Sequence, residues 1–152
     1  MTQSDLTRSD LGRQGHRLLQ VGVGLFLFSS LWGFVIPLVP VRRLGLSVHT
    51  LSAHEGIILI GLGLLWPRLA LDSARSRVAF WFFVYSTFAT LVPYVLAASW
   101  GAGDSVIPLA AGGARGTDLQ EAVITVVLYT AAPTVLVSLM LILWGLRRQT
   151  LG

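Results

Sequence analysis

Four apolar runs, each long enough to cross a lipid bilayer, dominate this sequence. They cover residues 18–39, 47–66, 78–100 and 119–146. An α-helix rises about 1.5 Å per residue, so about 20 apolar residues span the hydrocarbon core. None of the runs alternates polar and apolar residues as a membrane β-strand does, and none carries the polar stripe of a soluble bundle helix. The sequence therefore predicts an all-α integral membrane protein built as a four-transmembrane-helix bundle.

The composition agrees with a chain that is surrounded by lipid. Hydrophobic residues make up 54% of the 152 residues and charged residues only 12%, against about a quarter in soluble domains. The length suits one domain and no linker interrupts it, so residues 1–152 are expected to form a single membrane domain. The sequence has no cysteine, which excludes disulfides and thiolate chemistry. No basic stripe with interleaved aromatic residues occurs, so nucleic-acid binding is not expected.

Arginines between the runs predict the orientation in the membrane. Only Arg42, Arg43 and Arg115 lie in the connections after the first and third runs. The other eight of the eleven basic residues precede the first run, join the second to the third, or follow the fourth: Arg8, Arg13, Arg17, Arg68, Arg75, Arg77, Arg147 and Arg148. Because basic loops stay in the cytoplasm, both termini are expected to be cytoplasmic, and the glycine-rich segment 101–118 is expected outside.

Ionisable and polar side chains within the runs gather toward the expected outer half. His49 and Glu55 lie early in the second run, Tyr94 lies late in the third, and Glu121 lies early in the fourth. Ionisable groups inside a membrane span are costly and commonly mark a functional site. The shared depth predicts a site that opens toward the outer side or within the outer leaflet.

Small residues and one imidazole share a stripe on the second run. At about 100° per residue this stripe holds Gly45, His49, Ser52, Gly56 and Gly63. A smooth stripe with one imidazole can receive a flat ligand such as a porphyrin, whereas small residues also allow two helices to pack closely. Both interpretations stay open from the stripe alone.

The positions of the histidines restrict the possible metal chemistry. His49 and His54 lie on different faces of one helix, and His16 precedes the first run. A haem would therefore have one histidine ligand per subunit and an open sixth position, which suits ligand binding or catalysis rather than electron transfer. A zinc site from His49, Glu55 and Glu121 is the other possibility, although no HExxH signature is present.

Four segments together resemble the hydroxylaminobenzene mutases. These segments are "GFVIPLVPVRRLGLSVH", "EGIILIGLGLLWPRL", "WGAGDSVIPLAAG" and "LILWGLR", and the similarity runs from about Arg13 to Arg148. The four-helix outline of the chain also resembles that of the styrene oxide isomerases. In that family a histidine of the second span is followed six residues later by Asn-Gly, and a tyrosine follows in the third span. His49, Glu55-Gly56 and Tyr94 stand at these positions, with Glu55 in place of the asparagine.

The resemblance implies a haem b between the subunits of a homotrimer in the bacterial inner membrane, with His49 as the axial ligand of iron. It also implies a redox-neutral isomerase in which ferric iron acts as a Lewis acid on the oxygen of a small aromatic substrate. The substrate would be an arylhydroxylamine that becomes an aminophenol, or an aryl epoxide that becomes an aldehyde. Ser52 and Gly56 are expected to contact the haem, and Arg42 and Arg43 to pair with its propionates.

Two residues are expected to act on the substrate oxygen. Tyr94 would donate through its phenol, unless it serves only as an anchor near the membrane interface. Glu55 is expected to be protonated, because an ionised carboxylate in a span is costly, and only the protonated form can donate. A structural hydrogen bond from Glu55 to Thr125 or Tyr129 is the alternative.

Two functions without isomerase activity stay open. One is a non-catalytic haem-binding membrane subunit or sensor, and the other is a small-molecule transporter. Inverted repeats would favour transport, but the first and second pairs of runs show no convincing similarity to each other.

Overall fold

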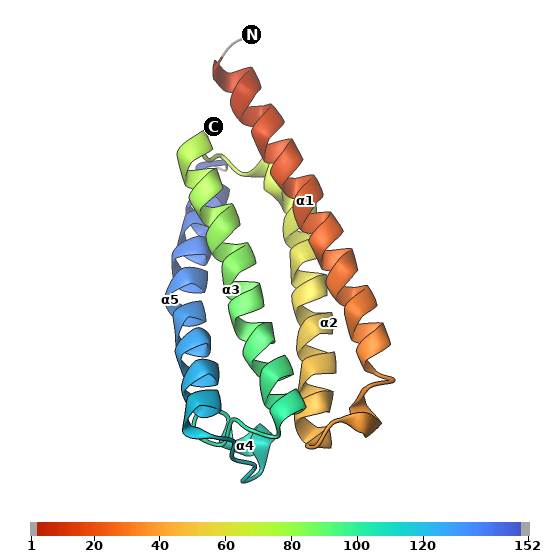
Figure 1. Cartoon of the computed structure of the whole chain (residues 1–152). Coiled ribbons are helices and arrows are strands. Elements are labelled where there is room, and N and C mark those ends of the chain that lie inside the picture. The colour runs from red at the N-terminus through yellow and green to blue at the C-terminus, as the bar shows by residue number, and fades with distance from the viewer. Residues whose placement is uncertain (1–2, 150–152) are drawn as a thin grey trace.

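The computed structural model describes residues 3–149, which form helices joined by short connections (Figure 1). No strand occurs among these residues, which confirms the predicted all-α class. The long helices are α1 (Gln3–Trp32), α2 (Arg42–Leu65), α3 (Ser73–Trp100) and α5 (Asp118–Gln149), and the short ones are η1 (Ile36–Leu38), η2 (Trp66–Arg68) and α4 (Pro108–Ala111).

Among residues 3–149, three helical segments are long and apolar enough to cross a membrane, as a multi-pass membrane protein requires. They are Arg42–Arg68, Ser73–Trp100 and Asp118–Arg147. Helix α1 does not join them, because its apolar part from residue 18 to Trp32 is shorter than the roughly 20 residues that a span needs.

The predicted first run, 18–39, extends beyond the end of α1. The chain leaves the helix at Trp32 through a tight turn, in which the Val35 N–H donates to the Trp32 carbonyl oxygen at 2.8 Å. Pro37 then begins the short η1 helix, where its ring fixes the backbone and it has no N–H to continue a hydrogen-bond ladder. Hydrophobicity alone did not reveal this turn, because the residues on both sides of it are apolar.

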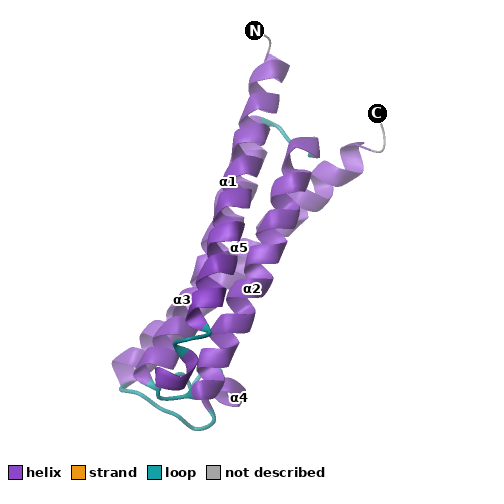
Figure 2. Cartoon of the chain, turned by 90° about the vertical axis from the view of Figure 1, so that its right-hand side faces the viewer, coloured by secondary structure: helices purple, strands orange, loops and turns teal. Residues whose placement is uncertain are grey.

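The long helices pack in two antiparallel pairs. Helix α1 lies along α2, α3 lies along α5, and the pairs meet where α2 contacts α3. The first turns of α1 and the last turns of α5 lie at one end of the bundle, and α4 lies at the other, as Figures 1 and 2 both show. The two ends of the bundle therefore match the two sets of arginines that the sequence separates.

Glycines let α1 and α2 touch backbone to backbone. A β-carbon on Gly15 would lie 2.7 Å from the carbonyl oxygen of Gly63, and one on Gly22 would lie 2.7 Å from that of Gly56. Only residues without a side chain permit such an approach. For Gly56 and Gly63, close helix packing is therefore the correct interpretation of the stripe on α2. The two contacts are seven residues apart on each helix, and a further seven residues lead to the candidate site.

Candidate functional site

His49 is held against α1 through one ring nitrogen. Its Nδ1 lies 2.8 Å from the backbone oxygen of Ser29 and 3.2 Å from the Ser29 hydroxyl. That hydroxyl donates to the carbonyl oxygen of His49 at 2.7 Å. Since a carbonyl oxygen only accepts, Nδ1 is the donor to Ser29 and carries the proton of the neutral ring. The second nitrogen, Nε2, therefore keeps its lone pair.

The Nε2 atom of His49 is accessible. It has no hydrogen-bond partner among the described residues, and no buried side-chain nitrogen or oxygen in that part of the chain lacks one. On α2, Leu46 and Ala53 share the side of the helix next to His49, and Leu46 is 53% exposed. A histidine whose Nδ1–H binds a carbonyl and whose Nε2 is open is arranged as a metal ligand. This donor set fits a haem with one axial imidazole.

Glu55 points to a different neighbour. Thr87 on α3 donates to Oε2 of Glu55 at 3.1 Å. The expected alternative, a hydrogen bond to Thr125 or Tyr129, is wrong because α2 packs against α3 rather than α5. His54, one residue earlier, is exposed.

The contact between α2 and α3 places Tyr94 level with His49. Because the two helices are antiparallel, moving seven residues from Glu55 and from Thr87 toward the α4 end leads to Val48 and Tyr94. Tyr94 is partly buried and packs against the apolar core. Glu55 lies about 9 Å deeper than His49, since each helical residue adds about 1.5 Å.

Ser52 and Gly56, the expected haem contacts, lie inside the bundle. Ser52 is fully buried, and its hydroxyl donates to a carbonyl of its own helix at 2.7 Å. Gly56 contacts Gly22 of α1. A flat ligand on His49 would therefore lie beside the contact between α1 and α2, toward the exposed side of α2, rather than along the stripe.

The two arginines that begin α2 have different surroundings. Arg43 donates from Nη1 to the carbonyl oxygen of Leu109 in α4, at 2.8 Å. Arg42 is exposed and makes no hydrogen bond or ion pair within residues 3–149. Of the two, Arg42 is the one whose guanidinium is fully available to an anionic group such as a propionate.

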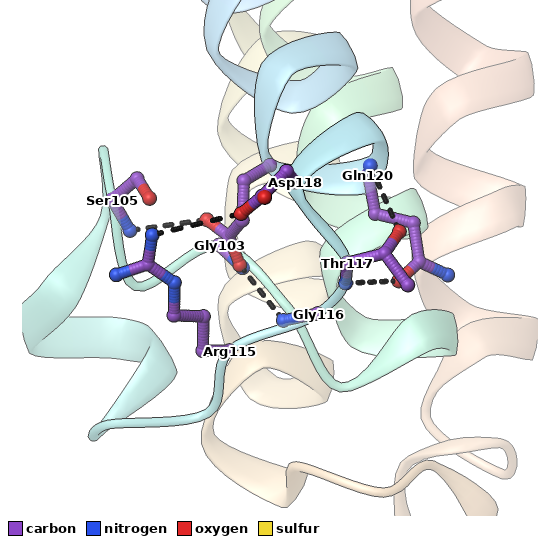
Figure 3. A network of polar contacts seen from close by, with 8 residues as sticks. Gly103, Ser105, Arg115, Gly116, Thr117, Asp118 and Gln120 are labelled. Atoms are coloured by element: carbon purple, nitrogen blue, oxygen red, sulfur yellow. Dashed lines mark hydrogen bonds and ion pairs between the residues drawn. The ribbon is translucent and has the colours of Figure 1, made fainter.

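The segment between α3 and α5 is folded around the buried carboxylate of Glu121. Oε1 accepts from the backbone N–H of Gly103 at 2.8 Å and of Gly116 at 3.0 Å, and Oε2 accepts from that of Ser105 at 3.1 Å. Figure 3 shows Gly103, Ser105 and Gly116 drawn together at the start of α5. Both ends of the segment are thereby fixed to one side chain, so this segment, called the α3–α5 loop below (residues 101–117), has a defined fold.

Because of these bonds, Glu121 is not available to a metal site with His49 and Glu55. Among the described residues, no three His, Cys, Asp or Glu side chains lie close enough to hold one metal ion. The zinc alternative is therefore wrong. The expectation that Glu121 belongs to the same layer as His49 missed the partners of its carboxylate, which are backbone groups of the α3–α5 loop.

One signal in the sequence does mark the start of α5. Thr117 and Gln120 form a capping box, in which the Thr117 N–H donates to the Gln120 side chain at 2.8 Å and the Gln120 N–H donates to the Thr117 hydroxyl at 3.3 Å. The pattern of Thr followed three residues later by Gln is a helix start. It indicates where the α3–α5 loop ends, one residue before the helix that carries Glu121.

Two apolar grooves open on the surface of the bundle. One lies between α1 and α3 and has a volume of about 520 Å³. The other lies between α3 and α5 beside Tyr85 and Tyr129, with a volume of about 740 Å³. Neither is lined by His49, Glu55 or Tyr94. Within one chain, His49 is directed toward α1 and Glu55 toward α3, so these residues do not converge on one of the two grooves.

Comparison with known proteins gives a consistent result. Residues 14–147 match the family described as Styrene oxide isomerase. Hydroxylaminobenzene mutase HabB from Ectopseudomonas oleovorans is 44% identical over 131 residues, which cover 86% of this chain and 80% of that protein. Hydroxylaminobenzene mutase HabA from the same organism is 37% identical over 131 residues, covering 86% of this chain and 97% of that protein. No solved structure matches.

Proposed function

Because this chain belongs to the styrene oxide isomerase family and is an isomerase, we propose that it rearranges an arylhydroxylamine to an aminophenol with the help of a haem b. The names of the two relatives, both hydroxylaminobenzene mutases, favour the arylhydroxylamine as substrate. The name of the family keeps an aryl epoxide as the second candidate. Both rearrangements keep all atoms of the substrate and need no net oxidation.

The observation that carries the proposal is the orientation of His49. Its Nδ1 donates to the Ser29 carbonyl oxygen at 2.8 Å, which leaves Nε2 as a fixed ligand for iron. When bound, ferric haem supplies an open coordination position and Lewis acidity toward the substrate oxygen. Arg42 is suited to pair with a propionate, since guanidinium binds carboxylates with paired donors.

The other steps fall to side chains of this chain. The Tyr94 phenol donates to the substrate oxygen as negative charge develops there, and protonated Glu55 is a second donor. In an apolar site without water, one placed donor stabilises such charge far more than it does in water. The Thr87 hydroxyl, at 3.1 Å from Oε2, holds the Glu55 carboxyl group in position.

We place the reaction site between the subunits of a homotrimer. His49 opens toward the exposed side of α2, whereas Glu55 is directed toward α3 of its own chain. A single chain leaves the ring of His49 open on one side, so a neighbouring subunit would have to supply the remaining wall. The apolar side chains exposed there, such as Leu46, suit a subunit contact.

We also propose that α1 crosses the membrane as the fourth span. It runs beside α2 from the contact of Gly15 with Gly63 to that of Ser29 with His49, so it covers the same depth. The eight arginines at the end of the bundle that holds the first turns of α1 and the last turns of α5 support a cytoplasmic location for that end. The membrane would be the inner membrane of a bacterium.

An absorption spectrum of the purified protein, followed by a product assay, tests the proposal. The wild type should show a Soret band and convert phenylhydroxylamine to an aminophenol. His49→Ala should lose the band, whereas His54→Ala should keep it, since His54 is exposed and lies away from the contact with Ser29.

Three results would contradict the proposal. Equal haem content in the two histidine variants would exclude His49 as the ligand. A haem-bound wild type without turnover of phenylhydroxylamine or styrene oxide would indicate a haem-binding subunit or sensor. A wild type without any Soret band would leave only functions that need no haem, among them transport.

A further inference from the structure

We propose that the crevice between α1 and α3 binds one anionic phospholipid, with the phosphate among arginines at its mouth and an acyl chain in its apolar part. The inference concerns a site separate from His49 and does not depend on bound haem. It rests on two cavities that lie between the same two helices, one polar and one apolar.

The mouth of the crevice carries an excess of positive charge. It has a volume of about 170 Å³, and its lining includes Arg13, Arg17 and Arg77 with a single carboxylate, Asp10. Arg13 forms an ion pair with Asp10. Arg17 and Arg77 have no ion-pair or hydrogen-bond partner among the described residues, so two guanidinium groups are left for an anion.

A neutral donor is fixed in the same cavity. The Nε1–H of Trp66, a fully buried side chain, donates to Oε1 of Gln14 at 2.9 Å. This bond uses the amide oxygen of Gln14 and leaves its NH₂ group as the part that can face the cavity. Two guanidinium groups and an amide NH₂ are all donors, and a phosphate group offers only acceptors to them.

The second cavity between α1 and α3 is lined by apolar residues only. This part, of about 520 Å³, lies between Leu25 and Phe28 on α1 and Phe88 and Val92 on α3, among others. Gly24 also lines it, and a β-carbon there would meet no atom within 4 Å. The missing side chain of Gly24 therefore leaves space in the groove.

The two parts follow each other along the helices. Because α1 and α3 run in the same direction, residues 10–17 of α1 lie beside residues 77–81 of α3, and residues 21–28 lie beside 88–96. From Arg17 to Phe28 the helix rises about 16 Å. This is about half of the hydrocarbon thickness of about 30 Å, the depth that the acyl chains of one leaflet occupy.

Charge and shape together favour a lipid over other occupants. A free phosphate would fill only the mouth, and a second copy of this chain would bring more arginines than carboxylates to this end of the bundle. The mouth lies at the arginine-rich end of the bundle, which is expected to face the anionic cytoplasmic leaflet. Arginines next to such a leaflet attract acidic headgroups.

Titration of the full-length protein in detergent with phosphatidylglycerol or phosphatidylcholine, followed by native mass spectrometry, tests the site. The wild type should retain one phosphatidylglycerol and discriminate against phosphatidylcholine. The double variant Arg17→Gln/Arg77→Gln should bind phosphatidylglycerol about thirtyfold more weakly. Gly24→Leu, which fills the groove and leaves the charges in place, should also weaken retention.

The matched control is the double variant Arg8→Gln/Arg68→Gln, which removes two positive charges outside the crevice at the same end of the bundle. It should bind like the wild type, and an equal loss there would show a general charge effect and overturn the site. Thermal protection by inorganic phosphate equal to that by phosphatidylglycerol would reduce the mouth to a simple anion site. Unchanged lipid binding in Gly24→Leu would exclude the acyl groove. A Gly24→Leu protein that changes its oligomeric state and binds no lipid would exclude it as well. If the double variant does not fold, Arg77→Gln alone should show a smaller loss in the same titration.

Discussion

Replacing Glu121 by alanine should open the α3–α5 loop without unfolding the bundle. The carboxylate accepts three backbone N–H bonds, from Gly103, Ser105 and Gly116. A hydrogen bond to a charged group contributes about 1.5–3 kcal/mol, and a buried donor left without a partner costs a similar amount. The bond to Gly103 is buried, whereas the other two are only partly buried, so water can replace Glu121 at two of the three positions.

The expected loss of loop stability follows from this difference in burial. The bond to Gly103 should account for about 2–3 kcal/mol and each of the others for about 1 kcal/mol, which gives about 4 kcal/mol. Glu121→Gln should lose less, about 1–2 kcal/mol. Its amide oxygen can still accept from Gly103 and Gly116, but its NH₂ group would face the N–H of Ser105.

Amide hydrogen exchange read by mass spectrometry measures this local stability. A loss of about 4 kcal/mol corresponds to exchange about 10³-fold faster, and it should be confined to residues 101–117. Asp104→Ala is the control, because Asp104 accepts only one exposed bond in the same loop, from the Gly113 N–H at 3.1 Å. Exchange that is unchanged in Glu121→Ala, or that rises equally in α2 and α3, would refute the reasoning.

Substitutions at two residues test the expected donors to the substrate. Tyr94→Phe removes the phenol, and turnover should fall about 10²-fold with the haem spectrum unchanged; undiminished turnover would exclude Tyr94 from the mechanism. Glu55→Gln keeps an acceptor for Thr87 and a donor for the substrate, so this variant should stay active. Glu55→Leu should lose activity with haem still bound. It should also be destabilised by about 1–3 kcal/mol, since buried Thr87 loses its hydrogen-bond partner. Equal activity of both Glu55 variants would show a purely structural role.

The helices could be predicted from the sequence, but their ends could not. Each of the predicted runs lies at least partly in a long helix, because apolar length is the requirement that lipid imposes. The helices extend beyond the apolar runs where polar residues continue them. Helix α3, for example, begins at Ser73 rather than residue 78, because the Asp72 carboxylate accepts the Arg75 N–H at 2.8 Å and caps it.

The depth of a residue within the bundle could also be predicted, but the helix that its side chain faces could not. His49 and Tyr94 share a level because the rise per residue is fixed and the runs alternate in direction. The neighbour that each residue faces depends on which helices pack together, and the sequence does not show that order. Glu55 meets Thr87 and not Thr125 for this reason. The partners of Glu121 were missed because they are backbone groups, which any residue type supplies.

The contact of α1 with α2 predicts that haem binding depends on a glycine that touches neither haem nor histidine. A β-carbon on Gly22 would lie 2.7 Å from the Gly56 carbonyl oxygen, so Gly22→Ala must push α1 away from α2. Seven residues further along α1, the same displacement would stretch the 2.8 Å contact between the Ser29 carbonyl and Nδ1 of His49.

Losing the hydrogen bond that orients a ligand histidine weakens metal binding about 10–100-fold, so Gly22→Ala should release haem at concentrations where the wild type retains it. The matched control is Gly24→Ala, two residues away on the same helix, where a β-carbon meets nothing within 4 Å. Haem titration of the two variants measures the difference. Equal haem affinity in both would mean that the spacing between α1 and α2 does not position His49, and that its orientation depends on α2 alone.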